Sequence, residues 1–353
     1  MLLLLSVFII AFFFAANIGA SGAATSMGIA YSAQAVTRRR GIWLCAIGMF
    51  LGAILGGGEV VKTLSDGIVP SSSVTLNVTL MILIAAALTL FSSNWLGIPL
   101  STSEVIVGAI VGLGLASHQL YIGNLILILT FWLLMPAVSF LAAFGSAHAI
   151  NRLNRYENRV KKWLVIIVVG LGFIEAFSAG MNNVANAIGP LVSVDLLTPS
   201  NGILLGGLFV SLGAVVLGGR TLETNGKKIT PLTLVEGGFV SGTTAILVIV
   251  ASVLGVPVPM AQMTTSAILG IGTAKKGFGH EQKRIVRKIL IVWAVSPVIS
   301  TVLSYGLIQV ILKNDVYTFV IMAGVCLSTI GLLTLYKMFN KENISKIQRE
   351  ELK

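Results

Sequence analysis

Three asparagine side chains interrupt a long apolar stretch near the middle of the chain. Asn182, Asn183 and Asn186 lie together there, with Gly180 and Pro190 on either side. An amide buried in a membrane is costly unless it finds hydrogen-bond partners, and irregular backbone at that depth must be buried or line a cavity. We therefore predict that the helix breaks here and offers free backbone groups to a polar guest, as in many secondary transporters. The alternative is a tight helix crossing, because small residues and asparagine also join membrane helices.

A second polar stretch runs from Pro99 through Ser101, Thr102 and Ser103 to Glu104. Proline ends one segment and hydroxyl side chains are natural N-caps, so we predict a helix that begins at this point. The free N–H groups and partial positive charge of a helix N-terminus bind oxyanions without a full cation. The alternative is an ordinary capped helix at a membrane boundary.

Two carboxylates, Glu104 and Glu175, fall within predicted membrane segments. Such carboxylates are expensive to bury and usually functional, so we predict that they carry protons or bind the coupling cation. Four other charged residues near the ends of spans are better explained by snorkelling or local ion pairs. These are Glu59, Lys62, Arg220 and Glu223.

The composition is that of an integral membrane protein. The chain has 353 residues, of which 56% are hydrophobic and 10% charged, and its mean hydropathy is +0.94. A soluble domain carries about 25% charged residues, so a water-facing surface of ordinary size cannot be built here. At about 20 residues per span there is room for roughly eleven spans, and we predict an all-α fold. The net charge of +11 would suit nucleic acid, but its distribution argues against that partner.

The basic residues form separate groups along the chain, at Arg38–Arg40, Arg152–Lys162, Arg220–Lys228, Lys275–Lys288 and Lys337–Lys353. The positive-inside rule places every group in the cytoplasm, which puts the N-terminus outside and the C-terminus inside the cell. The spans are then expected near residues 2–36, 42–62, 76–93, 98–116, 121–147, 163–197, 203–219, 236–254, 257–274, 288–312 and 316–336. The first and the sixth are expected to be broken, and the protein would be a multi-pass protein of the cell membrane.

The two halves of the chain resemble each other. Leu51–Thr63 aligns with Leu212–Thr224, and Gly97–Leu100 aligns with Gly255–Val258, at nearly the same spacing. Because an odd number of spans precedes the second copy, we predict inverted repeats with the site at the membrane midplane. The expected parts are a first repeat over 1–147, a basic cytoplasmic linker over 148–162, a second repeat over 163–312, and an extra span with a basic tail over 313–353. The extra span would serve packing or a homodimer surface.

The asparagine block has a counterpart near the N-terminus, where Asn17 aligns with Asn182 and Ser21 with Asn186. With these blocks the chain resembles the inorganic phosphate transporter (PiT) family, and most of all its branch of bacterial sulfate permeases. The family signature is Asn-Asp-Val-Ala-Asn-Ala, once in each half. Asn183 stands where the family has Asp in the second copy.

The first copy departs further from the signature, because Ile18 occupies the Asp position there. Other matching motifs occur in the family's order, at Gly57–Thr63, Ile98–Glu104 and Glu223–Ile229. The resemblance implies a substrate site built from both asparagine blocks and from the hydroxyl loop that helps to form the family's phosphate site. Its residues would be Asn17, Ser21, Ser101, Thr102, Ser103, Asn182, Asn183, Asn186 and Gln262, the last because it aligns with Glu104.

This resemblance predicts a secondary transporter that imports a tetrahedral oxyanion. Phosphate keeps a P–O–H at neutral pH and gains from an acceptor such as Asp, whereas sulfate only accepts, so the loss of both Asp residues favours sulfate. The expected coupling ion is a proton, with sodium as the alternative, because neutral oxygens can also hold Na⁺. A phosphate transporter coupled to either cation, and a membrane protein that transports nothing, are the competing interpretations.

The sequence contains no arrangement that suggests catalysis. The three histidines show no metal-ligand spacing, and neither a nucleophile–base pair nor an Asp-rich magnesium motif is present. We therefore expect no enzyme activity, no metal and no cofactor. Cys45 and Cys326 lie in apolar runs and are expected to be packing residues.

Overall fold

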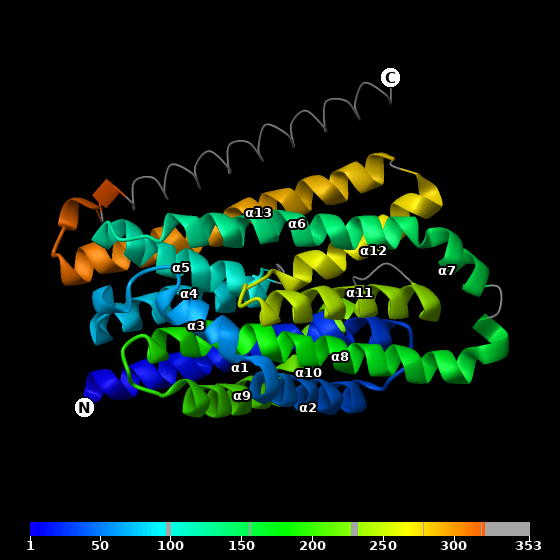
Figure 1. Ribbon diagram of the computed structural model, residues 1–353, viewed down its shortest axis with the longest axis horizontal. Coiled ribbons are helices and arrows are strands. Elements are labelled where there is room, and N and C mark those ends of the chain that lie inside the picture. Colours follow the sequence, from blue (N-terminus) through cyan, green and yellow to red (C-terminus); the bar gives the residue numbers. More distant parts are fainter. Residues whose placement is uncertain (97–99, 155–156, 227–231, 278, 319, 322–353) are drawn as a thin grey trace, which may run out of the picture. The chain divides into compact units, whose positions relative to one another are not determined.

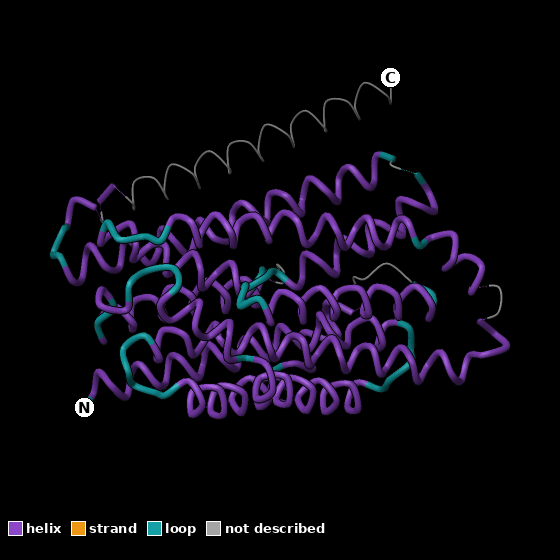
Figure 2. The backbone as a smooth tube through the Cα atoms, in the orientation of Figure 1, coloured by secondary structure: helices purple, strands orange, loops and turns teal. Residues whose placement is uncertain are grey.

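A computed structural model of the chain describes residues 1–96, 100–154, 157–226, 232–277, 279–318 and 320–321. The secondary structure in these ranges is helical, without a strand, which confirms the predicted all-α class (Figures 1 and 2). The helices are α1 (Leu2–Ser32), α2 (Arg38–Gly56), α3 (Gly58–Asp66), α4 (Leu76–Leu96), α5 (Thr102–Ser117), α6 (Ile122–Gly145), α7 (Ala147–Asn154), α8 (Glu157–Val192), α9 (Pro199–Val216), α10 (Gly218–Gly226), α11 (Leu234–Val253), α12 (Met260–Lys276) and α13 (His280–Leu307). A short 3₁₀ turn covers Ser71–Ser73, and a π-helical turn covers Ile308–Leu312.

Eight of the described helices are long and apolar enough to cross a membrane. The helices α5 and α12, with 16 and 17 residues, fall short of a full span of about 20 residues. The predicted extra span over 316–336 lies mostly outside the described residues, as do the basic tail, Pro99 and Cys326. The expected number of eleven crossings therefore stays a prediction.

The helix does not break at the asparagine block, so that prediction is wrong. The non-helical dihedral angles within α8 occur at Val160, far from the asparagines, and α1 is likewise continuous across Asn17. Gly180 serves a close crossing of two helices instead, because a Cβ at that residue would lie 2.0 Å from the carbonyl oxygen of Met49 in α2. For this glycine the alternative of a tight helix crossing is correct.

The interruptions lie in other segments of the chain. Gly57 separates α2 from α3, and Leu217 separates α9 from α10. A third interruption, residues 254–259, joins α11 to α12 and lies midway along the neighbouring helices (Figure 2). Residues 255–260 are buried, so the end of α11 and the start of α12 face each other inside the protein.

The order of helix types occurs twice along the chain. A long helix, an interrupted pair, a full-length helix, a short helix and another long helix follow one another as α1 to α6 and again as α8 to α13. The helix α7 joins the two series and, apart from its first residue Ala147, lies within the predicted linker 148–162. This recurrence agrees with the aligned sequence blocks, while the opposite orientation of the two copies stays a prediction.

The chain divides into two compact units, Met1–Tyr305 and Gly306–Lys353. Within the first unit α8 is central and packs against α1, α2, α3, α9 and α11, whereas α12 packs against α6 and α11. Large apolar side chains such as Trp43, Leu133 and Trp163 are exposed, as expected for a surface that faces lipid. In the second unit, Asp315 accepts hydrogen bonds from the hydroxyl and backbone N–H of Thr318, which hold the pKa of this carboxyl group below its usual range.

Candidate functional site

The helix α5 begins with the cap that the sequence predicts. Ser101 has extended backbone angles (φ −83°, ψ 127°), and its hydroxyl oxygen accepts a hydrogen bond of 3.5 Å from the backbone N–H of Glu104. Thr102 and Ser103, the first residues of the helix, are buried. The free N–H groups of the first turn therefore lie inside the protein, where they can serve a polar guest.

Hydroxyl groups of α5 meet the asparagines of α8 at one oxygen atom. The hydroxyls of Thr102 and Ser103 donate to Oδ1 of Asn183 at 3.2 and 3.5 Å, and Nδ2 of Asn186 donates to the same oxygen at 3.4 Å. Nδ2 of Asn186 also donates to the Thr102 hydroxyl oxygen at 3.1 Å. Asn183 is thus the shared acceptor of a buried, neutral network, and an anion could satisfy each donor equally well.

A small cavity adjoins this network. The walls come from four helices and are formed by Ser21, Gly22, Thr25, Leu100, Ser101, Thr102, Asn183, Met260 and Ala261. The volume of the cavity is about 20 Å³, which is room for about one water molecule. A tetrahedral oxyanion is larger than that, so the described conformation is closed around a site that must widen to receive one.

Asn182 is not among the residues that line this cavity. Its Nδ2 donates to the Ser252 hydroxyl and to the carbonyl oxygen of Val256, both at 3.0 Å, and its Oδ1 accepts from the backbone N–H of Val258 at 3.0 Å. The Ser103 hydroxyl adds a longer contact of 3.4 Å. Both polar atoms of the amide have protein partners, and these partners hold the connection from which α12 begins.

The N-terminal copy of the block reaches the cavity only in part. Ser21 forms part of the wall, together with Ser101 and Asn183. Asn17 is buried one helical turn earlier, and its Nδ2 donates to the carbonyl oxygen of Phe13 in the same helix at 2.9 Å. The described contact of Asn17 is therefore within α1, and Ser21 is the residue of this copy that lies at the cavity.

Both intramembrane carboxylates meet α12. Nε2 of Gln262 donates to Oε1 of Glu104, and the hydroxyl of Thr264 donates to Oε1 of Glu175 at 3.1 Å. In the described part of the chain, Oε2 of each carboxyl group is buried without a hydrogen-bond partner. Glu104 does not line the cavity, so its carboxyl group does not face the position of an anion held there.

Charged residues near the ends of the helices form local ion pairs, as expected. Lys62 pairs with Glu59 at 2.7 Å, and Glu223 pairs with Arg38 at 3.0 Å. The sequence analysis missed an ion pair between the buried Glu236 and the partly exposed Lys275. The spacing of Thr233 and Glu236 is that of a capping box, which is the signal that could have pointed to it.

The sequence analysis also missed the part that α1 and α12 take in the cavity wall through Gly22, Thr25, Met260 and Ala261. Apart from Thr25, these are small or apolar residues of kinds that occur throughout the chain. No local pattern distinguishes them, because their role depends on which helices meet.

Comparison with known proteins places this chain among transporters. Residues 18–304 match the model of a family described as the phosphate transporter family. The chain is 50% identical to the sulfate permease CysP of Bacillus subtilis over 97% of both chains. A putative phosphate permease of Pyrococcus abyssi is 28% identical and covers 81% of this chain and 92% of its own. A solved structure of a sodium-dependent phosphate transporter matches with a TM-score of 0.77 and 26% identity, over 89% of this chain and 100% of that one.

Proposed function

This chain belongs to the phosphate transporter family, and from that premise we propose that it is a secondary transporter that imports sulfate across the cell membrane. The observation that carries the proposal is the 50% identity, over 97% of both chains, to a protein named as a sulfate permease. Relatives at 28% and 27% identity are named as putative phosphate permeases, which makes phosphate the alternative substrate. Because these relatives are permeases, we propose no enzyme activity for this chain.

The hydrogen bonds of the network beside the cavity support sulfate over phosphate. Donors from Thr102, Ser103 and Asn186 converge on the neutral Oδ1 of Asn183. Sulfate at neutral pH only accepts hydrogen bonds, so it can replace this oxygen as the partner of all these donors. A carboxylate at Asn183 would hold the donors more firmly and repel a dianion, whereas it would accept the proton that phosphate retains.

The residues of the site divide into two proposed roles. Ser21, Ser101, Thr102, Ser103, Asn183 and Asn186 bind the anion at the N-terminus of α5. Asn182 and Gln262 position α12, whose residues Met260 and Ala261 form one wall of the cavity. Asn17 would join the first group if its side chain left the Phe13 carbonyl oxygen. Movement of α12 away from α5 would widen the cavity for the anion.

Coupling to protons accounts for the two buried acids. Moving a dianion inward against an inside-negative potential costs about 4.6 kcal/mol per 100 mV. Glu104 and Glu175 would each carry one proton, since each has one buried carboxyl oxygen without a partner in the described part of the chain. Sodium is the alternative, and Oδ1 of Asn186, also buried and unpartnered there, is a neutral oxygen that suits it.

The proposed setting follows the charge distribution. The N-terminus lies outside and the basic groups and the C-terminus lie in the cytoplasm, by the positive-inside rule. Residues 1–147 and 163–312 form two inverted repeats around the site, joined by the basic linker 148–162. Residues 313–353, most of which lie outside the described residues, would add a further membrane segment with the surface of a homodimer, and a cytoplasmic tail.

Counterflow into liposomes tests the proposal directly. Purified protein in liposomes preloaded with sulfate should accumulate labelled sulfate, and selenate should compete well while excess phosphate barely competes. Equal competition by phosphate would make the protein a general oxyanion permease. Chemical conversion of the labelled compound would indicate an enzyme, and uphill accumulation that an ionophore abolishes excludes a passive channel.

A further inference from the structure

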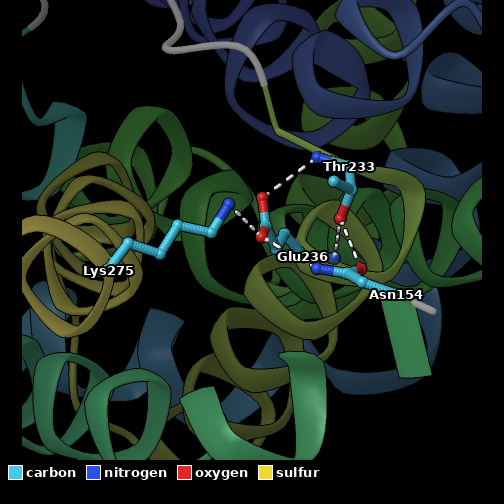
Figure 3. Close-up of polar contacts among 4 residues, drawn as sticks. All are labelled: Asn154, Thr233, Glu236 and Lys275. Atoms are coloured by element: carbon cyan, nitrogen blue, oxygen red, sulfur yellow. Dashed lines mark hydrogen bonds and ion pairs between the residues drawn. The ribbon is translucent and has the colours of Figure 1, made fainter. Parts of the chain in front are cut away.

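A buried carboxylate outside the substrate site is held by three other side chains or backbone groups (Figure 3). Glu236, in the first turn of α11, is fully buried and pairs with Lys275 in the last turn of α12. Oε2 of Glu236 accepts from the backbone N–H of Thr233 at 3.0 Å, and Oε1 accepts from Nδ2 of Asn154 at 3.2 Å. The Thr233 hydroxyl in turn donates to Oδ1 of Asn154 at 2.8 Å. The cluster ties α11 and α12 to α7, the helix between the two halves.

The two members of the ion pair are not equally dependent on each other. Glu236 keeps two further hydrogen bonds and the favourable N-terminus of α11 if Lys275 leaves. The Lys275 side chain is 36% exposed, whereas that of Glu236 is 0% exposed, so the ammonium group can move into water. Breaking a buried pair is normally costly because it strands a charge. Here the surrounding donors remove much of that penalty, so the pair can open without unfolding the end of α12.

Buried polar groups without hydrogen-bond partners occur on α8, α11 and α12, in the described part of the chain. Thr273 of α12, Thr244 of α11 and Oε2 of Glu175 in α8 are buried without a hydrogen-bond partner in the described part of the chain. Orphaned polar groups in a protein interior call for an explanation, such as a state in which water reaches them. Glu175 lies on the same face of α8 as Asn182, about 10 Å along the axis. Gln262 and Lys275 are separated by about 20 Å of α12.

We propose that these groups line the cytoplasmic half of the transport path, between α8, α11 and α12, and that the Glu236–Lys275 pair is its gate. The inference rests on the proposed function and on its orientation, which puts the ends of α11 and α12 that carry the pair in the cytoplasm. Opening the pair frees the last turn of α12 from α11 and lets water reach Thr244 and Glu175. The freed ammonium group of Lys275 then stands at the mouth of the path, where it attracts a departing dianion.

The test uses a reporter cysteine inside the path. In a background with Cys45 and Cys326 replaced by alanine, Thr244→Cys is labelled by a membrane-impermeant maleimide added at the cytoplasmic side of membrane vesicles. Lys275→Met and Glu236→Gln should each raise the labelling rate by about tenfold. This corresponds to a free energy of opening that is lower by about 1.4 kcal/mol. Lys275→Arg keeps the charge and should keep the slow rate. Lys62→Met breaks the exposed pair with Glu59 and is the matched control, with no change expected.

A variant that is expected to slow labelling distinguishes a gate from a contact that only stabilises the fold. Asn154→Ala removes one of the hydrogen bonds that stabilise Glu236 when Lys275 leaves, so the pair should open less often and labelling should slow severalfold. A contact that only stabilises the fold would be weakened in every variant and labelling would become faster, so faster labelling in Asn154→Ala would overturn the proposal. Unchanged rates in Lys275→Met and Glu236→Gln would overturn it as well. If the charge variants do not fold, Asn154→Ala decides alone, and only slower labelling supports the gate.

The failure of the gate can be told apart from the failure of the proposed function. Labelling is measured without sulfate, and sulfate counterflow is measured on the same preparation. If the parent protein shows no sulfate counterflow but the variants change the labelling rate as expected, sulfate transport is rejected and the gate is supported. Normal counterflow, together with a labelling rate that Lys275→Met and Glu236→Gln leave unchanged, rejects the gate alone.

Discussion

One amide oxygen, Oδ1 of Asn183, receives hydrogen bonds from Thr102, Ser103 and Asn186. All four side chains are neutral and buried, so the network holds its donors in place without adding charge to the site. A neutral acceptor is easily replaced by a dianion, because the anion offers the same donors a stronger, charge-assisted bond. Whether an amide or a carboxylate occupies this position therefore determines which anion the site prefers.

Asn183→Asp should lower sulfate uptake by about ten- to a hundredfold, because a mismatched buried polar group costs about 1–3 kcal/mol. Phosphate competition should rise in the same variant. Labelled sulfate uptake in liposomes, with and without phosphate, measures both effects. Asn201→Asp makes the same change at an exposed position of α9 and should leave uptake normal. Sulfate uptake that is unaffected by Asn183→Asp would mean that this residue does not set selectivity.

Ser101→Ala and Asn182→Ala should both abolish sulfate uptake while membrane expression stays intact. Ser101 caps α5 and lines the cavity, whereas Asn182 holds residues 256–258 ahead of α12. Ser117→Ala is the control on α5, because the Ser117 hydroxyl bonds back to Leu113 at the far end of that helix. Uptake and surface expression of the three variants are compared in cells. Normal transport by both site variants would show that the site is assigned wrongly.

At the scale of single elements, α12 connects the parts of the site. Its first turns contact Glu104 through Gln262 and Glu175 through Thr264, and its start is held by Asn182. These contacts join α12 to α5 and to α8. Any change in the charge of either carboxyl group changes a hydrogen bond to α12, which also forms a wall of the cavity. Cation binding can therefore affect the anion site through this helix.

Gly180→Ala should destabilise the protein, because its Cβ would lie 2.0 Å from the Met49 carbonyl oxygen and force α2 away from α8. Overpacking of this kind costs about 1–3 kcal/mol. Gly170→Ala is the matched control on α8, since a Cβ there meets no atom within 4 Å. That change should be neutral or stabilising by up to about 1 kcal/mol. Thermal unfolding in detergent compares the two, and equal midpoints would contradict the close crossing.

Local chemistry explains what the sequence could predict. Ser101 caps α5 because a hydroxyl ahead of a helix satisfies an N–H group of its own first turn, and nothing remote is required. Gly180 was predicted to break a helix and instead allows a crossing, because its role is decided by Met49 in a different helix. Asn182 was predicted to bind substrate, and its contacts with Ser252 at the end of α11 and with Val256 in the connection after it could not be predicted, because only the fold brings these residues near α8.

At the scale of the whole molecule, transport must join anion entry to a source of energy. Sulfate import against an inside-negative potential costs about 4.6 kcal/mol per 100 mV for the two charges. The chain offers two buried carboxyl groups near the site, Glu104 and Glu175, each linked to α12. Two protons carried with one sulfate ion would cancel the charge, so the electrical cost would vanish and the pH gradient would supply the driving force.

A pH gradient, acid outside, should therefore drive sulfate uptake into sodium-free liposomes, and a membrane potential set with potassium and valinomycin should change that uptake little. Glu175→Gln should lose the uphill, pH-driven uptake but keep sulfate counterflow, because exchange needs no net movement of protons. Labelled sulfate is followed in both assays for the parent and the variant. Glu59→Gln changes an exposed carboxylate in a surface pair and should behave like the parent. A strict requirement for sodium would reject proton coupling, and uptake that responds steeply to potential would require a third cation beyond the two that Glu104 and Glu175 can carry.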